Sequence, residues 1–337
     1  MHERQAILQL FADCAASVLA TVVEVQGSAY RRAGARMLLT PDGRSAGVIN
    51  GGCLDADLHR RSRLVLESGR AQLAVYDTTS PQDILFGLGL GCRGVVKILL
   101  EPAKELDWLG REVAVEVVYE GDVLGTRLVD GLECPRFETG GFNHSGAVHS
   151  LRETLEAPQR LFIFGAGADV VPLQRLAANV GWGVQTVDLR PPSPSRATFI
   201  ESRHVAPENL GEFEVPPDAA CVIMTHNFLH DLELLKRLLP SPAAYVGLLG
   251  PRRRAEELLA KIGGDTLLPG IAPTQAQLAR FFAPIGLDCG AETPEEIALS
   301  IVAEIQCVKR GTTGGSLRTC SSIHGDKNPG KQDSRGE

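Results

Sequence analysis

This sequence of 337 residues has few aromatic side chains, no long apolar run and no excess of positive charge. No apolar run reaches the roughly 18 residues that indicate a membrane-spanning helix, so no membrane segment is expected. The 34 Lys and Arg residues against 41 Asp and Glu give a formal net charge of −7, which offers nucleic acid no attractive surface. The first residues also lack the basic and apolar pattern of a secretory signal, and we expect a cytoplasmic protein.

The eight cysteines lack the spacings of familiar metal sites. None forms a C-x-x-C pair, and no Cys and His spacing matches a zinc site. In a reducing cytoplasm the thiols stay free. Residues such as Cys221 and Cys307 are therefore expected to be small, buried, apolar side chains.

Cys53 and Cys92 differ from the other cysteines because each follows glycine, in GGCLD (51–55) and GLGLGCRG (87–94). Turns of this kind let a ligand approach the thiol closely. The helix predicted after Cys53, and Arg93 after Cys92, each favour a lowered thiol pKa. For either cysteine alone, a tight turn that merely tolerates a small residue explains the pattern equally well.

Residues 1–102 mix helical and strand patterns, which predicts a compact α+β domain. The predicted helices cover 5–20 and about 54–69, and the predicted strands include 20–28, 71–77, 93–102 and a hairpin around the P-D-G turn at 41–43.

Residues 103–158 are expected to form a connecting subdomain. A hairpin is predicted around Gly121 and Asp122. The turn-rich stretch that follows it, ETGGFNHSGAVHS (138–150), is expected to be a surface loop.

Over residues 159–310, continuous apolar strands alternate with helices, the pattern of a parallel sheet covered on both faces. The last helix is predicted to begin at Thr293 as its cap, with Pro294 in the first turn and Glu296 closing a capping box. The sequence thus predicts an α/β protein in which the N-terminal α+β domain precedes a Rossmann-like, doubly wound parallel sheet. A disordered tail is expected over 311–337.

The stretch FGAGADV (164–170) lies between a predicted strand and a predicted helix, where the backbone of Gly165 and Gly167 would hold a phosphate. Asp188 ends the next predicted strand, where an acid commonly binds ribose hydroxyls. The third glycine of the dinucleotide fingerprint is missing, because Val170 stands in its place. A Rossmann fold whose turn binds no ligand is therefore the alternative.

Other candidate ligand contacts are basic or polar residues in loops, at the ends of predicted strands or at the start of a predicted helix. They are Arg31, Arg32, Arg190, Thr225, His226, Arg252 and Arg253. Guanidinium groups clamp phosphates and carboxylates, and a histidine at a strand end can contact a ligand. The alternatives are a solvated helix face for an arginine and a hydrogen-bonded structural role for the histidine.

Taken in order, these stretches resemble the xanthine dehydrogenase accessory protein family, the XdhC and CoxI type of molybdenum cofactor maturation factor. The resemblance is carried by GSAYRRAGARML (27–38), GVINGGCLDADL (47–58), FGLGLGCRG (86–94), LFIFGAGADVVPL (161–173), VQTVDLRP (184–191), MTHNFLHDLELL (224–235), YVGLLGPRRR (245–254) and IGLDCGAETPEEIALSIVAEI (285–305). Family members often have a histidine after the second glycine of the turn, where this chain has Ala168.

The resemblance implies a chaperone that binds molybdenum cofactor, in its molybdopterin or dinucleotide form, and inserts it into an apo-hydroxylase of the xanthine dehydrogenase or carbon monoxide dehydrogenase type. It also implies a cysteine desulfurase partner that supplies the sulfido ligand of molybdenum, no catalytic residues in the chaperone itself, and a homodimer as a plausible state. On this interpretation Gly165, Gly167 and the arginines hold the anionic end. Cys53 or Cys92 would contact molybdenum, because thiolates suit soft metal–sulfur centres.

Two other functions stay open on the sequence alone. One is an NAD(P)-dependent oxidoreductase that uses the Rossmann half, although no hydride-transfer constellation is recognisable. The other is a non-catalytic assembly scaffold in which the glycine turn binds nothing.

Overall fold

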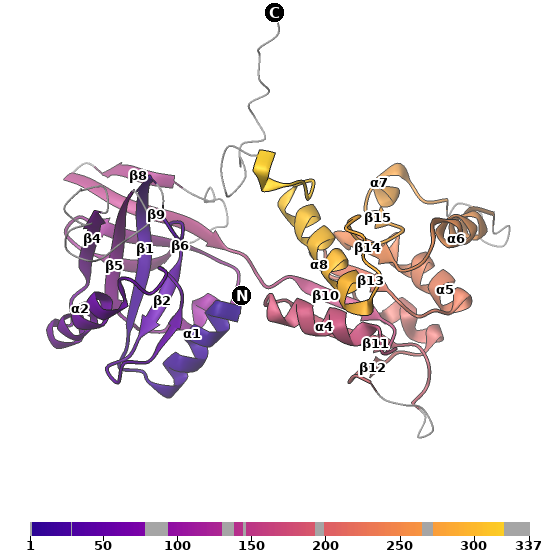
Figure 1. Cartoon of the computed structure of the whole chain (residues 1–337), viewed down its shortest axis with the longest axis horizontal. Coiled ribbons are helices and arrows are strands. Elements are labelled where there is room, and N and C mark those ends of the chain that lie inside the picture. Colours follow the sequence, from indigo (N-terminus) through magenta and orange to yellow (C-terminus); the bar gives the residue numbers. More distant parts are fainter. Residues whose placement is uncertain are drawn as a thin grey trace, which may run out of the picture. The chain divides into compact units, whose positions relative to one another are not determined.

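The chain folds into two compact units, Met1–Pro158 and Gln159–Glu337 (Figure 1). The computed structural model describes residues 2–27, 29–77, 94–129, 138–143, 146–192, 199–264 and 272–319. The segment expected to connect two domains, 103–158, lies within the first unit. None of the helices in the described ranges is both long and apolar enough to cross a membrane.

The first unit is built around a five-stranded antiparallel sheet. In spatial order its strands are β3 (Ser45–Gly47), β2 (Arg36–Leu39), β1 (Val18–Gly27), β5 (Gly94–Pro102) and β4 (Gln72–Asp77). Side chains of β1 alternate between the two faces, as the pleat of a strand requires. Val22 faces helix α2 (Asp55–Ser68), whose Leu58 lies in the same apolar cluster. Leu19 belongs instead to the cluster of helix α1 (His2–Asp13).

A second antiparallel sheet packs against the first and shares a core with it. Its strands, in spatial order, are β7 (Gly125–Val129), β6 (Val113–Glu120), β9 (Gly146–Leu155) and β8 (Glu138–Asn143). Val23 and Leu99 of the first sheet form one buried cluster with Val117, Tyr119 and Leu151 of the second. The short helix η1 (Leu106–Gly110) links the two sheets.

The prediction of a surface loop over 138–150 is wrong, because these residues supply β8 and the start of β9. Glycine and asparagine in this stretch suggest turns, but β9 pairs with β6 from Leu155 to His149. Strand formation depends on pairing and packing more than on local preference, so the partner strand outweighs the composition here.

A buried ion pair joins the two sheets. Arg36 on β2 binds Glu153 on β9, and both side chains are less than a tenth exposed. The Arg36 guanidinium also donates to the carbonyl of Gly34 and lies over the ring of Trp108. A buried charge that loses its partner is costly, because neither water nor protein then solvates it.

We expect Glu153→Ala to lower the free energy of unfolding of the first unit by about 3–5 kcal/mol, since it leaves Arg36 buried and unpaired. The double variant Arg36→Met with Glu153→Leu removes both charges and should be distinctly more stable than Glu153→Ala. Urea titrations followed by circular dichroism measure both. A urea midpoint for Glu153→Ala equal to that of the unmodified chain would show that the Arg36–Glu153 pair does not stabilise the fold.

The second unit contains a six-stranded sheet in which all strands run parallel. In spatial order the strands are β12 (Arg203–His204), β11 (Gly183–Asp188), β10 (Arg160–Phe164), β13 (Ala220–Ile223), β14 (Tyr245–Leu248) and β15 (Phe281–Phe282). Numbered within this unit, the order is 3-2-1-4-5-6, which is that of a Rossmann fold. The predicted fold class is therefore confirmed.

Helices cover both faces of this sheet (Figure 1). Helices α4 (Val170–Asn179) and α8 (Pro294–Arg310) pack on one face, with Leu173 and Ile301 in a single buried cluster. Helices α5 (Phe228–Leu238) and α6 (Arg252–Gly264) pack on the other face, together with η2 (Pro207–Glu212).

The predicted start of α8 is confirmed, because the Thr293 hydroxyl accepts from the Glu296 amide and the Glu296 carboxylate accepts from the Thr293 amide. The helix ends at Gly311, which adopts a left-handed conformation. The tail expected to be disordered is described as far as Thr319, through the short helix η3 (Leu317–Thr319). One further short helix is α7 (Gln275–Leu278).

Candidate functional site

The sheet of the second unit opens a crevice between β10 and β13. From β10 the chain passes through α4 to β11, whereas from β13 it passes through α5 to β14 on the opposite side. The loops after these two neighbouring strands therefore diverge at the carboxyl edge, where ligands of such sheets bind. The structure brings together here the predicted turn at Gly165–Gly167 and the predicted pair Thr225 and His226.

Gly165 is needed because the two loops touch backbone to backbone. Its φ is +137°, a value that other residues rarely adopt, and a Cβ at this position would overlap the carbonyl oxygen of Met224. The amide of Met224 donates to the carbonyl of Phe164 at 2.8 Å. The loop after β13 is thereby held directly against the glycine turn.

The loop after β13 carries its own conformational strain. His226 has a φ of +54°, in the left-handed region that non-glycine residues avoid. Its Nε2 lies 2.7 Å from Oδ2 of Asp169, which stands directly before α4. The pair thus links the glycine turn to the loop after β13 across the crevice.

Asp169 is a site residue that the sequence analysis missed. Its Oδ1 lies so close to Gly167 that a Cβ on Gly167 would overlap it. The Asp169 carboxylate therefore lies against Gly167, in the turn that was predicted to hold a phosphate. The signal available in the sequence was the acidic residue inside FGAGADV, but its histidine partner lies 57 residues further along the chain.

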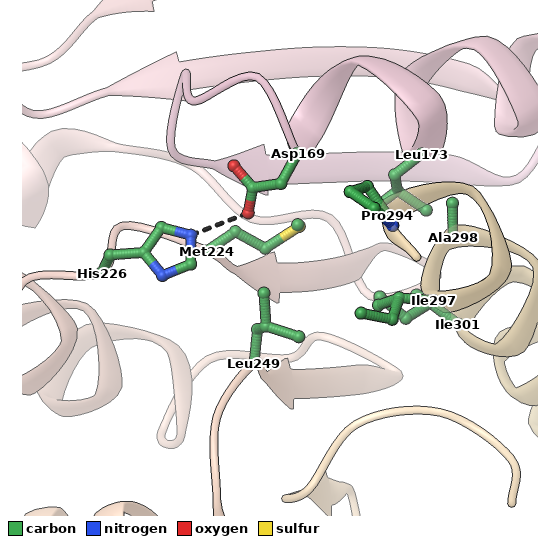
Figure 2. A pocket seen from close by; sticks show the side chains of 9 residues that line it. All are labelled: Asp169, Leu173, Met224, His226, Leu249, Pro294, Ile297, Ala298 and Ile301. Carbon is green, nitrogen blue, oxygen red and sulfur yellow. Dashed lines mark hydrogen bonds and ion pairs between the residues drawn. The ribbon is translucent and has the colours of Figure 1, made fainter. Parts of the chain in front are cut away.

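Next to this pair lies a cavity of about 300 Å³ (Figure 2). Its lining residues are Asp169, Leu173, Met224, His226, Leu249, Pro294, Ile297, Ala298 and Ile301. Figure 2 shows the hydrogen-bonded His226 and Asp169 at one side and the side chains of α8 at the other. Among the described residues that line it, none is Lys or Arg, so the cavity is apolar with polar groups at one end.

Thr225 is engaged in a structural network. Its hydroxyl donates to Oδ1 of Asp231, a buried residue of α5, and Arg254 donates to Oδ2 of the same carboxylate at 2.6 Å. Asn227 caps α5 by accepting from the amides of Leu229 and His230. Asp231 therefore ties the loop after β13 to the start of α6, a role that the sequence analysis did not identify.

Arg252 and Arg253 remain available for a ligand, because both are exposed in the first turn of α6. Arg253 forms a long ion pair of 3.5 Å with Glu257, and its side chain is 87% exposed. The two guanidinium groups stand close in sequence to Leu249, which lines the cavity.

Asp188, predicted to bind a ribose, already holds Arg190. Two nitrogens of the Arg190 guanidinium and its backbone amide donate to this carboxylate, which is nearly buried. The hydrogen bond to Asp188 raises the pKa of Arg190 above its usual value. A ribose hydroxyl would have to compete with the Arg190 guanidinium for the oxygens of the Asp188 carboxylate.

Cys53 is exposed in the first unit, in the loop before α2. The loop is organised by Asn50, whose side-chain oxygen accepts from the amides of Gly52 and Leu54 and lies 3.7 Å from the Cys53 sulfur. Asn50 in turn donates to Asp55 at 2.9 Å. The thiol is therefore presented by an ordered turn.

Arg31 is committed to an ion pair, since its guanidinium forms a fork with Glu3 of α1 at 2.7 and 2.9 Å. Hydrogen bonding between them raises the pKa of Arg31 and lowers that of Glu3. Arg32 is partly exposed. Cys92 and Arg93 lie outside the described residues, so the role predicted for Cys92 stays a prediction.

We expect Gly165→Ala to destabilise the second unit by about 1–3 kcal/mol through backbone strain alone, with the Met224 overlap adding to it. Gly263→Ala is the matched control: it lies in α6 with open space around it, and alanine favours a helix, so it should be neutral or slightly stabilising. Thermal unfolding compares the variants. Equal melting temperatures for Gly165→Ala and the unmodified chain would contradict the close approach of the two loops.

Comparison with known proteins agrees with this architecture. A family model described as the XdhC Rossmann domain matches residues 161–305, and one described as the XdhC and CoxI family matches residues 12–77. A Bacillus subtilis protein named as a probable xanthine dehydrogenase subunit is 32% identical over 330 residues, covering 88% of this chain and 94% of that protein.

Two further similarities concern a named chaperone and a solved structure. The Escherichia coli molybdenum cofactor insertion chaperone PaoD is 26% identical over 301 residues, covering 87% of this chain and 83% of PaoD. A crystal structure of a xanthine dehydrogenase from Bacillus halodurans matches with a TM-score of 0.73 and 29% identity, covering 97% of this chain and all of that one. The resemblance seen in the motifs is thus confirmed, and the chain belongs to the XdhC and CoxI family.

Proposed function

We propose that this chain carries molybdenum cofactor as cargo and inserts it into an apo-molybdenum hydroxylase of the xanthine dehydrogenase or carbon monoxide dehydrogenase type. The observation that carries the proposal is its similarity to PaoD, a molybdenum cofactor insertion chaperone, over most of both chains. The names of the Bacillus subtilis relative and of the solved Bacillus halodurans structure refer to xanthine dehydrogenase, which fits a client of that class.

The described residues suit two parts of such a cargo, its phosphate and its ring system. An anionic phosphate matches the exposed guanidinium groups of Arg252 and Arg253. A flat ring system matches the apolar cavity beside Asp169 and His226. The cavity volume of about 300 Å³ is at the lower limit for a small-molecule pocket, so it suits one end of the cargo and not the whole.

The metal–sulfur end of the cargo is assigned to a thiol. Cys53 is exposed on an ordered turn, and thiolates bind soft metal–sulfur centres. Cys92 remains the second candidate. A cysteine desulfurase would supply the sulfur that becomes the sulfido ligand of molybdenum, and the chaperone itself is assigned no catalytic residue.

An NAD(P)-dependent oxidoreductase is the second candidate function, favoured by the sheet order and the glycine turn. Two observations weigh against it: a carboxylate rests on the turn, and Asp188 holds Arg190. Trp182, partly buried beside β11, gives a direct test. Added NADH should leave its fluorescence unchanged in a chaperone and should quench or shift it in a dehydrogenase.

Cofactor insertion is tested by activating a client. Chain purified from a host that makes molybdenum cofactor, mixed with an apo-hydroxylase of the xanthine dehydrogenase type, should restore substrate oxidation. Chain purified from a host unable to make the cofactor is the control and should restore none. Equal activity from both preparations would contradict the proposal.

The role of Cys53 has its own test. Cys53→Ala should reduce cofactor retention and client activation by roughly tenfold or more. Removing even a residue that only supports a metal's direct ligands typically costs about that much, and a direct contact should cost no less. Cys289→Ala is the matched control, because Cys289 is also an exposed free cysteine but lies in the second unit. If Cys53→Ala retains and delivers cofactor as well as Cys289→Ala does, the assignment of molybdenum to this thiol is wrong.

A further inference from the structure

The feature from which a further inference follows is the position of the Asp169 carboxylate. One oxygen lies against Gly167 of the turn, and the other is 2.7 Å from Nε2 of His226. The side chain is about a quarter exposed and lines the cavity. In a Rossmann fold this turn normally receives a phosphate through its backbone amides. Here a negatively charged side chain lies beside that turn.

A carboxylate in this place sets what the turn can accept. Its two oxygens are hydrogen-bond acceptors and it has no donor when ionised, so it binds groups that present N–H. A phosphate brought to the same turn would meet a like charge, and no lysine or arginine among the described lining residues offsets it. The turn therefore disfavours a pyrophosphate and favours an N–H edge.

The cavity beside the carboxylate suits a planar ring. The side chains of Leu173, Met224, Leu249, Ile297 and Ile301 supply apolar surface, and the polar groups are gathered at one end. Ligand pockets commonly combine an apolar wall with a few polar groups that fix orientation. A pterin has this composition, because its flat fused rings carry an amino group next to a ring N–H on one edge.

We propose that Asp169 is a specificity-determining residue: its carboxylate accepts the amino and ring N–H groups of a pterin seated in the cavity, and excludes pyrophosphate from the glycine turn. The pterin identity rests on the function proposed above. His226 holds the carboxylate in position through the 2.7 Å hydrogen bond. The phosphate of the cargo would then bind elsewhere, and the exposed guanidinium groups of Arg252 and Arg253 on the same edge of the sheet suit it.

The test uses two probes that need no loaded cofactor: free pterin, followed by its fluorescence, and inorganic pyrophosphate, followed by calorimetry. The variant is Asp169→Asn, which keeps the shape and an oxygen for His226 but replaces one acceptor with an NH₂ donor. The unmodified chain should bind pterin, and it should bind pyrophosphate more weakly than the variant does. Asp169→Asn should bind pterin about tenfold or more weakly, because a hydrogen bond to a charged group is lost, and should gain pyrophosphate binding.

Glu295→Gln is the matched control, since it removes one negative charge from the exposed first turn of α8, beside Pro294 of the cavity, without lining the cavity itself. It should change neither affinity. Circular dichroism confirms that each variant is folded.

Unchanged pterin affinity in Asp169→Asn, or pyrophosphate binding by the unmodified chain as tight as by the variant, would overturn the inference. Client activation without pterin binding at this cavity would also overturn it while leaving the proposed function intact. Pterin binding without client activation would contradict the proposed function and leave the inference about Asp169 intact.

Discussion

The contact between the backbone of Gly165 and the carbonyl of Met224 is the constraint on which the candidate site depends. Two loops that leave neighbouring parallel strands in opposite directions would ordinarily open a wide crevice. Here the absence of a side chain at Gly165 lets the loop after β13 lie on the glycine turn. His226 then reaches Asp169, and the space left beside them is closed by Leu249 and by the first turns of α8.

At the carboxyl edge of the parallel sheet, buried carboxylates are paired, whereas two arginines are exposed. Each buried carboxylate is paired: Asp188 with Arg190, and Asp231 with Thr225 and Arg254. The exposed cations Arg252 and Arg253 stand apart from these pairs. The site thus has an apolar cavity with an acceptor at its end and a separate basic edge. This division suits a ligand with a flat neutral ring and a distant anionic group better than it suits a dinucleotide whose pyrophosphate binds at the turn.

Sequence reasoning succeeded where the signal is local and failed where it depends on distant partners. The alternation of apolar strands and helices predicts the doubly wound sheet, and the capping box predicts the start of α8 to the residue. The strands at 138–143 and 146–155 were missed because their stability comes from pairing and not from their own composition: β9 pairs with β6, and β8 pairs with β9. The hydrogen bond from His226 to Asp169 spans 57 residues, and no pattern in either segment specifies it.

The same limit applies to the predicted ligand contacts. Arg31 was expected to face an anion, but Glu3, 28 residues earlier in the chain, already binds it. Thr225 lies at the predicted place, but its hydroxyl is used by Asp231. A sequence identifies which side chains reach a functional edge, whereas only the fold shows which of them are already paired.

The central claim is that the chain carries a pterin-based molybdenum cofactor. Its most direct test is the pterin and molybdenum content of the chain purified without air from a host that makes the cofactor. Acid oxidation converts any bound pterin into a fluorescent derivative, and elemental analysis counts the metal. We predict both, in equal amounts and at a substantial fraction of one per chain. Protein that carries neither, from a host in which the cofactor is present, would contradict the account.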